Sequence, residues 1–248
     1  MNILKAVFWD VDGTIADTEL EGHRIAFNRS FHDYDLDWRW DQLTYQNLLK
    51  ISGGLNRIKF YNKSAKEKIT DDMCKKVQIR KGLHYKNIIR SGVIRPREGV
   101  LRLINELHCQ NVEQYIVTTS GRASLEPLLK TILEKSIKCF SGSITCEDVV
   151  SLKPHPEAYL KVISYCHFPI ENCIAIEDSL NGVASAKAAN IKCLMTPPAW
   201  LDKDDITSTT ANACVDSLGS LTNPSNLIYG IPIMNKIVDF NYLTSLIV

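Results

Sequence analysis

Short apolar runs alternate along most of the chain with longer segments whose apolar residues recur at helical spacing. The apolar runs predict strands at residues 4–9, 114–118, 139–145, 173–177 and 191–195, and a short strand near 213–215 that would close one edge of a sheet. The helical spacing predicts helices at residues 98–109, 123–134, 156–166 and 180–189. Strands that alternate with helices are typical of a parallel sheet covered on both faces, so we expect an α/β fold with a doubly wound parallel sheet.

Residues 33–92 interrupt this alternation with many polar and aromatic residues, helical patterning and little strand signal. A helix at 19–32 precedes them, with Thr18 in the N-cap position and Glu21 in the matching capping-box position. We therefore predict a helical domain inserted into the sheet domain. The predicted domains are a core of residues 1–18 and 93–248 and a helical cap of residues 19–92. Residues 222–248 show little pattern, although Val238–Val248 is apolar enough to dock against the core.

The bulk composition excludes several classes of protein. The chain has 248 residues, of which 45% are hydrophobic and 23% charged, as in ordinary globular proteins. A formal net charge of +1 gives no electrostatic reason to expect a nucleic-acid partner, and no apolar run is long enough to span a bilayer. The eight cysteines form no Cys-x-x-Cys pair and no zinc-site spacing, which favours reduced thiols. With the first strand beginning so early, we expect no secretory signal, and we expect a cytoplasmic monomer.

Two aspartates follow the first predicted strand, in the sequence Lys-Ala-Val-Phe-Trp-Asp-Val-Asp-Gly-Thr of residues 5–14. Open α/β sheets bind ligands beyond the carboxyl ends of their strands, and Asp10 and Asp12 would leave the strand on the same side. Carboxylates this close repel each other unless a cation or a proton lies between them. Hard oxygen ligands of this kind suit Mg²⁺, while an ordinary Asp-Gly turn is the alternative.

Three later segments carry further polar groups at the ends of predicted elements. Residues 114–120 end in hydroxyls, residues 152–156 place a lysine before a proline, and residues 173–178 end in an acidic pair. Each has an ordinary explanation when taken alone. Thr118 would cap the next helix, Lys153 would be a solvated surface lysine, and the acidic pair would favour a helix N-terminus.

In this order and with these gaps, Asp-x-Asp-Gly-Thr, Thr/Ser, Lys-Pro and Glu-Asp resemble the haloacid dehalogenase (HAD) superfamily of phosphoryl-transfer enzymes. The resemblance implies a Rossmann-like core and an aspartyl-phosphate on Asp10, the nucleophile. Asp12 would be the general acid and base, and its backbone carbonyl would face the metal. The predicted Mg²⁺ ligands are Asp10, Asp12, Glu177 and Asp178.

The same resemblance implies groups that hold the transferring phosphoryl group. Thr118 would bind it through its hydroxyl, assisted by the backbone N–H groups of Thr119 and Ser120. Lys153 would supply a fixed positive charge to the phosphoryl group and to Asp10.

The inserted segment is similar to the CbbY family, whose implied activity is removal of phosphate from xylulose 1,5-bisphosphate, an inhibitor of Rubisco. The similarity rests on residues 16–28, on Trp38-Arg39-Trp40-Asp41, and on the stretch from Leu48 through Ser52-Gly53-Gly54 to Arg57-Ile58. A sugar phosphate needs cationic and hydrogen-bonding groups in the cap. The candidates are Glu19, His23, Arg24, Gly53, Gly54 and Arg57. His23 and Arg24 could equally be exposed polar positions, and Leu55 stands where relatives often carry lysine.

Three functions are compatible with these motifs. The first is a Mg²⁺-dependent sugar-phosphate phosphatase, and the second is a phosphomutase of the β-phosphoglucomutase type, which shares the cap and the phospho-aspartate. The two differ in whether water or a sugar hydroxyl attacks the intermediate. A non-catalytic protein on this fold is the third, although every catalytic position holds the required residue type.

Overall fold

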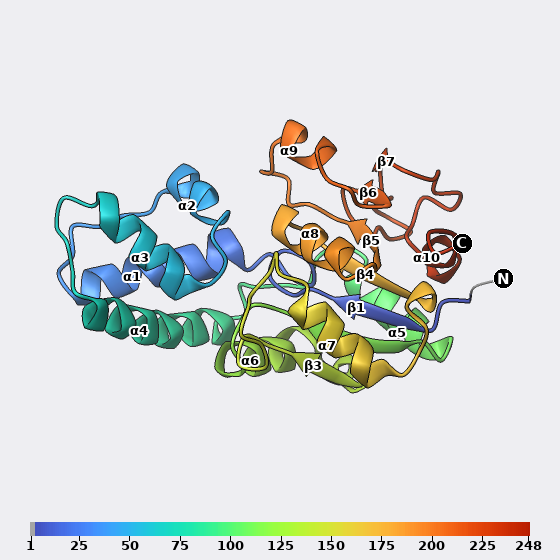
Figure 1. The fold of residues 1–248 in the computed structure, drawn as a ribbon, viewed down its shortest axis with the longest axis horizontal. Coiled ribbons are helices and arrows are strands. Elements are labelled where there is room, and N and C mark those ends of the chain that lie inside the picture. The colour runs from blue at the N-terminus through green and yellow to red at the C-terminus, as the bar shows by residue number, and fades with distance from the viewer. Residues whose placement is uncertain (1–2) are drawn as a thin grey trace.

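A seven-stranded sheet forms the centre of the larger lobe in the computed structural model, which describes residues 3–248 (Figure 1). Residues 1 and 2, which the predicted core domain includes, lie outside the described residues. The strands are β1 (Ala6–Trp9), β2 (Glu113–Val117), β3 (Gly142–Ile144), β4 (Cys173–Glu177), β5 (Lys192–Met195), β6 (Ala213–Val215) and β7 (Leu227–Tyr229). Their order is β3-β2-β1-β4-β5-β6-β7, and only β6 and β7 pair antiparallel. The predicted doubly wound α/β fold is confirmed.

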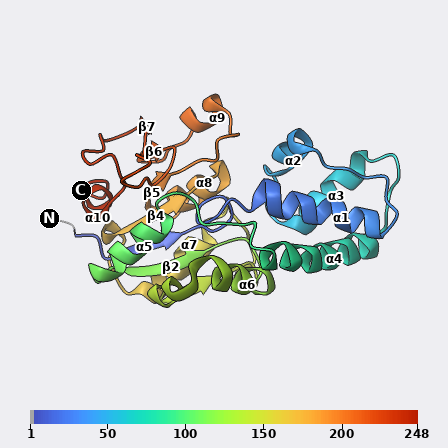
Figure 2. The same ribbon diagram turned by 180° about the vertical axis from the view of Figure 1, so that it is seen from behind.

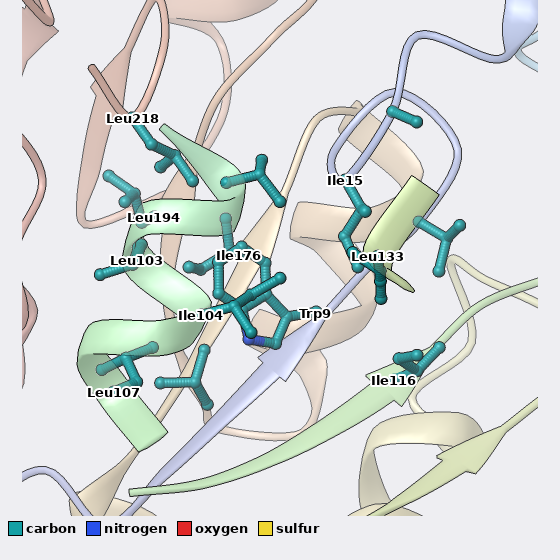
Figure 3. Packing of buried hydrophobic residues seen from close by; sticks show 14 of the residues in the cluster. Trp9, Ile15, Leu103, Ile104, Leu107, Ile116, Leu133, Ile176, Leu194 and Leu218 are labelled. Atoms are coloured by element: carbon teal, nitrogen blue, oxygen red, sulfur yellow. The ribbon is translucent and has the colours of Figure 1, made fainter. Parts of the chain in front are cut away.

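Helices cover both faces of the sheet because alternate residues of each strand point to opposite sides. On β1, Val7 and Trp9 face one cluster and Ala6 and Phe8 face the other. The first cluster includes residues of α5 (Val100–Cys109), α6 (Arg122–Leu133) and α10 (Phe240–Ser245). The second includes residues of α7 (Glu157–Cys166), α8 (Leu180–Ala188) and α9 (Lys203–Thr207). Short 3₁₀ turns complete this lobe at η2 (Glu134–Cys139) and η3 (Ile170–Asn172). Figure 3 shows the indole of Trp9 at the centre of the first cluster.

A separate lobe of helices lies beyond the carboxyl ends of β1 and β4 (Figures 1 and 2). Its elements are η1 (Glu19–Arg24), α1 (Ile25–Asp33), α2 (Gln42–Leu48), α3 (Gly54–Ser64) and α4 (Asp71–Arg90). An aromatic cluster fills it, with ring centroids 4.7 Å apart between Phe27 and Trp40 and 5.9 Å apart between Trp40 and Tyr45. We call this lobe the cap; the boundaries given above for the two domains stay a prediction.

The C-terminal region differs in part from the sequence prediction. The strand near 213–215 was expected to close an edge, and this is wrong, because β7 pairs beyond it as the antiparallel edge strand. A strand of three largely exposed residues shows no alternation from which it could be predicted. The expected docking of Val238–Val248 is confirmed, since Val238, Leu243 and Ile247 belong to the first core cluster.

Arg97 fixes the loop that follows β1. It lies where the chain re-enters the core, and its guanidinium donates hydrogen bonds to the carbonyls of Gly13, Thr196, Pro197 and Asp216. These four acceptors belong to three separate segments of the core. The loop that carries the first two aspartates is therefore tied to the ends of β5 and β6.

Two bulk properties complete the description. No helix among residues 3–248 combines the length and the hydropathy needed to cross a membrane. The eight cysteines, all within the described residues, are free thiols.

Candidate active site

Three buried carboxylates meet at the carboxyl ends of β1 and β4. Trp9 pairs with Ile176 across these neighbouring strands, so Asp10 and Glu177 come side by side as each strand ends, and Asp178 follows. One carboxylate oxygen from each of the three acids lies within 4.8 Å of those of the other two. Asp10 and Asp178 are 7% and 6% exposed, and Glu177 is fully buried. The pair does directly precede the N-cap of α8 (Ser179), as the ordinary explanation expected, and its burial beside Asp10 is what that explanation did not foresee.

Lys153 neutralises part of this charge. Its ammonium donates hydrogen bonds to Asp10 Oδ1 at 2.8 Å, to Glu177 Oε1 at 2.6 Å and to the carbonyl of Val117 at 2.7 Å. Lys153 is 4% exposed, so it is not a solvated surface lysine. Burial alone would lower the pKa of Lys153, but Asp10 and Glu177 hold it above its ordinary value. Its charge is therefore fixed at neutral pH.

The acids remain short of positive charge. Burial raises the pKa of Asp10 to about 8, against the opposing effect of Lys153. Burial also raises the pKa of Asp178 well above its usual range, and Asp10 and Glu177 add to the shift. Three carboxylates with one buried lysine therefore attract either protons or a further cation.

The donor set fits a divalent metal ion such as Mg²⁺. Glu177 Oε2 is buried and has no hydrogen-bond partner among the described residues, although Oε1 accepts from Lys153 and from the Tyr159 hydroxyl. A Cβ at Gly182 would collide with the Glu177 carboxylate, and one at Gly13 would collide with that of Asp178. These glycines leave the space for the acids, and hard carboxylate oxygens suit Mg²⁺.

Asp12 points away from this cluster toward the cap. Its Oδ1 accepts hydrogen bonds from Thr18 at 2.6 Å and from His23 Nε2 at 3.0 Å, and its Oδ2 accepts from the Ser120 hydroxyl at 2.5 Å. Burial alone would raise the pKa of Asp12, but His23, Ser120 and Thr18 hold it well below its usual value. The carboxylate of Asp12 is not part of the cluster of Asp10, Glu177 and Asp178; a role for its backbone carbonyl stays a prediction.

The hydrogen bond to Asp12 also corrects the prediction that Thr18 caps the first cap helix. Thr18 makes no side-chain capping bond, and a π-helical turn, η1, begins the helix instead. Its hydroxyl faces Asp12 because the loop after β1 folds back under the cap. The position of Thr18 directly before a predicted helix favoured a capping role. It could not show that the hydroxyl would instead donate a hydrogen bond to Asp12.

Lys81 is a site residue that sequence reasoning missed. It lies on α4, is 6% exposed, and its ammonium lies 2.7 Å from His23 Nδ1. Since the ammonium can only donate, this contact assigns the proton of His23 to Nε2, which then donates to Asp12. A signal for it existed, because Lys81 falls on the apolar stripe of α4 with Val77 and Tyr85.

Thr118 is 2% exposed, and its hydroxyl accepts the backbone N–H of Ser120 at 3.0 Å. It does not cap α6, whose N-cap position is Gly121. Thr119 lines both a chamber of about 70 Å³ beside Asp10 and a larger cavity of about 380 Å³ under the cap. The turn after β2 therefore reaches the space beside Asp10, and its role in holding a phosphoryl group stays a prediction.

The larger cavity continues from Asp12 into the cap. Arg57 is held there by the carbonyl of Ile51 at 2.8 Å, by the Tyr45 hydroxyl at 3.3 Å and by Glu19 at 3.8 Å. The cap residues that line this cavity include Glu19, His23, Gly53, Gly54, Leu55, Arg57, Gln78 and Lys81. His23 is 5% exposed, which rules out an exposed position for it. Arg24 lines neither this cavity nor the chamber.

The cap rests directly on the core beside the chamber. Ser52 donates its hydroxyl to the carbonyl of Lys153 at 2.5 Å, and Asn181 donates to the carbonyl of Lys50 at 3.2 Å. Asn181 also lines the chamber. The two lobes thus enclose the acids in a small, polar space.

Residues 7–196 match the family of haloacid dehalogenase-like hydrolases. The chain belongs to this family. It is 34% identical over 206 residues to the protein CbbY of Rhodobacter capsulatus, covering 83% of this chain and 90% of that protein. These similarities show that the chain is a phosphatase of the HAD type.

Two solved structures extend the comparison. A variant of CbbY from Rhodobacter sphaeroides, in complex with xylulose-(1,5)bisphosphate, is 28% identical and superposes with a TM-score of 0.81, covering 89% of this chain and 98% of that one. A β-phosphoglucomutase from Clostridium difficile is 20% identical with a TM-score of 0.73, covering 99% of this chain and 97% of that one, and shows the same fold.

Proposed function

We propose that this phosphatase is Mg²⁺-dependent, forms an aspartyl-phosphate on Asp10, and removes phosphate from xylulose 1,5-bisphosphate. The observation that carries the proposal is that two spaces share part of their lining, namely Asp12, Glu19, Arg57 and Thr119. A chamber beside Asp10 and Lys153 adjoins a cavity of about 380 Å³ that presents Arg57 and Lys81. One phosphate would react in the chamber while cations in the cap hold the other. The complex of the CbbY relative with this bisphosphate supports the same assignment.

The residues divide the reaction between them. The carboxylate of Asp10 attacks phosphorus, and the sugar oxygen leaves with a proton from Asp12. Water then gives a proton to Asp12 and attacks the phospho-aspartate, which releases phosphate and restores Asp10. Lys153 orients Asp10 and balances the charge of the phosphoryl oxygens. Asp10, Glu177 and Asp178 would hold Mg²⁺, which supplies further charge neutralisation when bound.

The present hydrogen bonds of Asp12 suit the second half of this reaction. Thr18, His23 and Ser120 keep it ionised, as a base must be. The first half needs a proton on the same carboxylate. A phosphate dianion that enters beside Asp12 raises its pKa by like-charge repulsion, and thus favours the acid form at the required time.

Leu55 need not weaken binding of the second phosphate. It packs partly against the aromatic cluster of the cap while it lines the cavity. Lys81 supplies a cation to the same cavity from α4. The charge that relatives often place after the Gly-Gly pair is therefore available here from another element.

A panel of sugar mono- and bisphosphates with Mg²⁺ tests the substrate. We expect phosphate release from xylulose 1,5-bisphosphate with kcat/KM at least about 100-fold above that for ribulose 1,5-bisphosphate, because cap contacts beyond the reacting phosphate set the difference. Broad, weak hydrolysis would remove this substrate and leave the phosphatase chemistry in place. Conversion of glucose 1-phosphate into glucose 6-phosphate would instead identify a mutase.

The pH dependence of binding tests the role of Lys81. Burial lowers the pKa of Lys81 to about 8, so its amine is charged below that pH and neutral above it. We therefore expect KM for the bisphosphate to rise about tenfold between pH 7 and pH 9.5. Acetyl phosphate has no second phosphate and serves as the control, with a KM that follows only the reacting centre. A Lys81→Met variant should show a high KM for the bisphosphate at both pH values; a retained pH dependence would assign the titration to another group.

A further inference from the structure

Tyr159 is a fully buried tyrosine whose hydroxyl meets one of the acids. It lies near the start of α7, in the second core cluster. Its hydroxyl lies 2.5 Å from Glu177 Oε1. A phenol is protonated at neutral pH and a carboxylate oxygen only accepts, so the hydroxyl is the donor of this hydrogen bond. Tyr159 lines neither the chamber nor the larger cavity, so any effect that it has on the reaction passes through Glu177 and its neighbours.

The same carboxylate oxygen also binds Lys153. The ammonium donates to Glu177 Oε1 at 2.6 Å, to Asp10 Oδ1 at 2.8 Å and to the carbonyl of Val117 at 2.7 Å. An ammonium has three donors, so all of them are engaged. The ring of Tyr159 lies beside this ammonium as well, with 5.3 Å between Nζ and the ring centroid. Tyr159 therefore contacts both members of the ion pair between Lys153 and Glu177.

The hydroxyl of Tyr159 shares Glu177 Oε1 with the ammonium. Without it, Lys153 would be the one hydrogen-bond donor left to this carboxylate among residues 3–248. The buried charge of Glu177 would then draw the ammonium toward itself and away from Asp10. The ring that carries the hydroxyl is held by packing, with 6.4 Å between its centroid and that of Phe8 on β1. Tyr159 is thus a fixed donor rather than a mobile one.

We propose that Tyr159 is a positioning residue, whose hydroxyl holds the carboxylate of Glu177 so that Lys153 stays on Asp10 and a metal ion meets acids in fixed positions. This inference rests on the proposed function and deepens it. Replacing a group that donates a hydrogen bond to a metal-binding side chain typically lowers metal affinity or activity by about 10–100-fold. The alternative is that Glu177 only satisfies the buried hydroxyl of Tyr159, and loss of the hydroxyl would then leave both quantities unchanged.

The experiment compares Tyr159→Phe with the wild type. Phenylalanine keeps the ring beside Lys153 and removes only the hydroxyl. The probe of the acids is Mn²⁺, which takes the same oxygen ligands as Mg²⁺ and whose binding is followed directly by electron paramagnetic resonance. We expect Kd for Mn²⁺ to rise about tenfold and kcat with saturating Mg²⁺ to fall about tenfold. KM for xylulose 1,5-bisphosphate should change less than about twofold, because Tyr159 lines neither space that the substrate would fill.

Tyr115→Phe is the matched control. Tyr115 also packs against Phe8, with 6.1 Å between the ring centroids, and its hydroxyl donates to Glu113 Oε2 at 2.6 Å. Glu113 begins β2, so this pair lies toward the opposite end of the strands from the acids. The control should leave Kd for Mn²⁺, kcat and KM unchanged. Melting curves without metal confirm that both variants are folded at the assay temperature.

Two results would overturn the inference. Unchanged Mn²⁺ affinity and kcat in Tyr159→Phe would show that the hydroxyl only finds a partner in the core, and equal losses in Tyr115→Phe would show that any hydroxyl lost beside Phe8 disturbs the sheet. The wild type tests the proposed function separately. Should it keep full activity after a chelator has removed Mg²⁺, the proposed metal dependence is wrong, and the change in kcat alone decides the role of Tyr159. Should it prefer another sugar phosphate, the same comparison is made with that substrate.

Discussion

Replacing Asp10 with asparagine is expected to abolish turnover, with kcat at least about 10⁴-fold below the wild type. The amide is neither a nucleophile toward phosphorus nor an anion for a metal ion, and no other carboxylate can take its place. Asp12 is held by Thr18, His23 and Ser120, and Asp178 lies on the neighbouring strand end. Phosphate release should be abolished both for the best sugar phosphate and for acetyl phosphate, because both substrates require attack by Asp10 on phosphorus.

The same variant separates lost chemistry from lost folding. Burial raises the pKa of Asp10 to about 8 in the absence of metal, so ionisation of this group at neutral pH opposes folding. A neutral asparagine removes that opposition, and the melting temperature of the metal-free variant should equal or exceed that of the wild type. Asp17→Asn is the matched control in the same loop, since the Asp17 carboxyl is 71% exposed and should be dispensable for turnover. Phosphatase activity within about tenfold of the wild type in freshly purified Asp10→Asn, checked by mass spectrometry for deamidation, would exclude Asp10 as nucleophile.

The sheet was predictable from the sequence because its strands are buried on both faces. Such strands appear as continuous apolar runs, and the polar residues that end them mark the carboxyl edge. β4 is fully buried along its length and ends at Glu177, so both its position and its acidic end could be inferred. β7 has none of these properties, because an exposed edge strand carries no burial pattern, and only pairing with β6 creates it.

The acids and Lys153 could be predicted from the sequence, whereas part of the cap cavity could not. Asp10 directly follows β1 and Glu177 ends β4, so their positions in the chain indicate where they lie in the sheet. Lys153 could be located because it precedes Pro154. Lys81 and Gln78 come to the cavity only through the packing of α4 on the cap core. Helical periodicity shows which face of α4 is inward, but it does not show that the inward face ends over a substrate cavity.

The burial of three carboxylates makes this site electrostatically unbalanced. Taking Asp10, Glu177 and Asp178 out of water costs free energy, and the ammonium of Lys153 offsets only part of that cost. The space between the acids suits a second cation. The unmatched charge that raises the pKa of Asp10 and Asp178 is what a bound divalent ion would neutralise. Replacing Lys153 should therefore reduce both catalysis and stability. A bound metal ion should restore the stability more readily than the catalysis.

Lys153→Met should accordingly lower kcat by about 10³-fold and destabilise the metal-free protein by about 3–5 kcal/mol at pH 7. The three hydrogen bonds of the ammonium are lost, and Asp10 and Glu177 are left without their shared counter-charge. The pKa of Lys153 is raised in the folded state, so its contribution to stability is fully present below pH 10.5, its unfolded value, and disappears only at higher pH. The measurements are steady-state kinetics with Mg²⁺ and urea unfolding with and without Mg²⁺.

The exposed residue Lys135, in η2, provides the matched control, because Lys135→Met removes a lysine that is far from the acids. Saturating Mg²⁺ should raise the stability of Lys153→Met more than that of the wild type, since the ion then faces acids with no other counter-charge. It should not restore kcat, because a divalent ion cannot replace an ammonium that is held by the carbonyl of Val117 and orients Asp10 by a hydrogen bond. Full recovery of kcat with Mg²⁺ would mean that Lys153 serves only as a counter-charge, and the positioning role argued for it would be wrong.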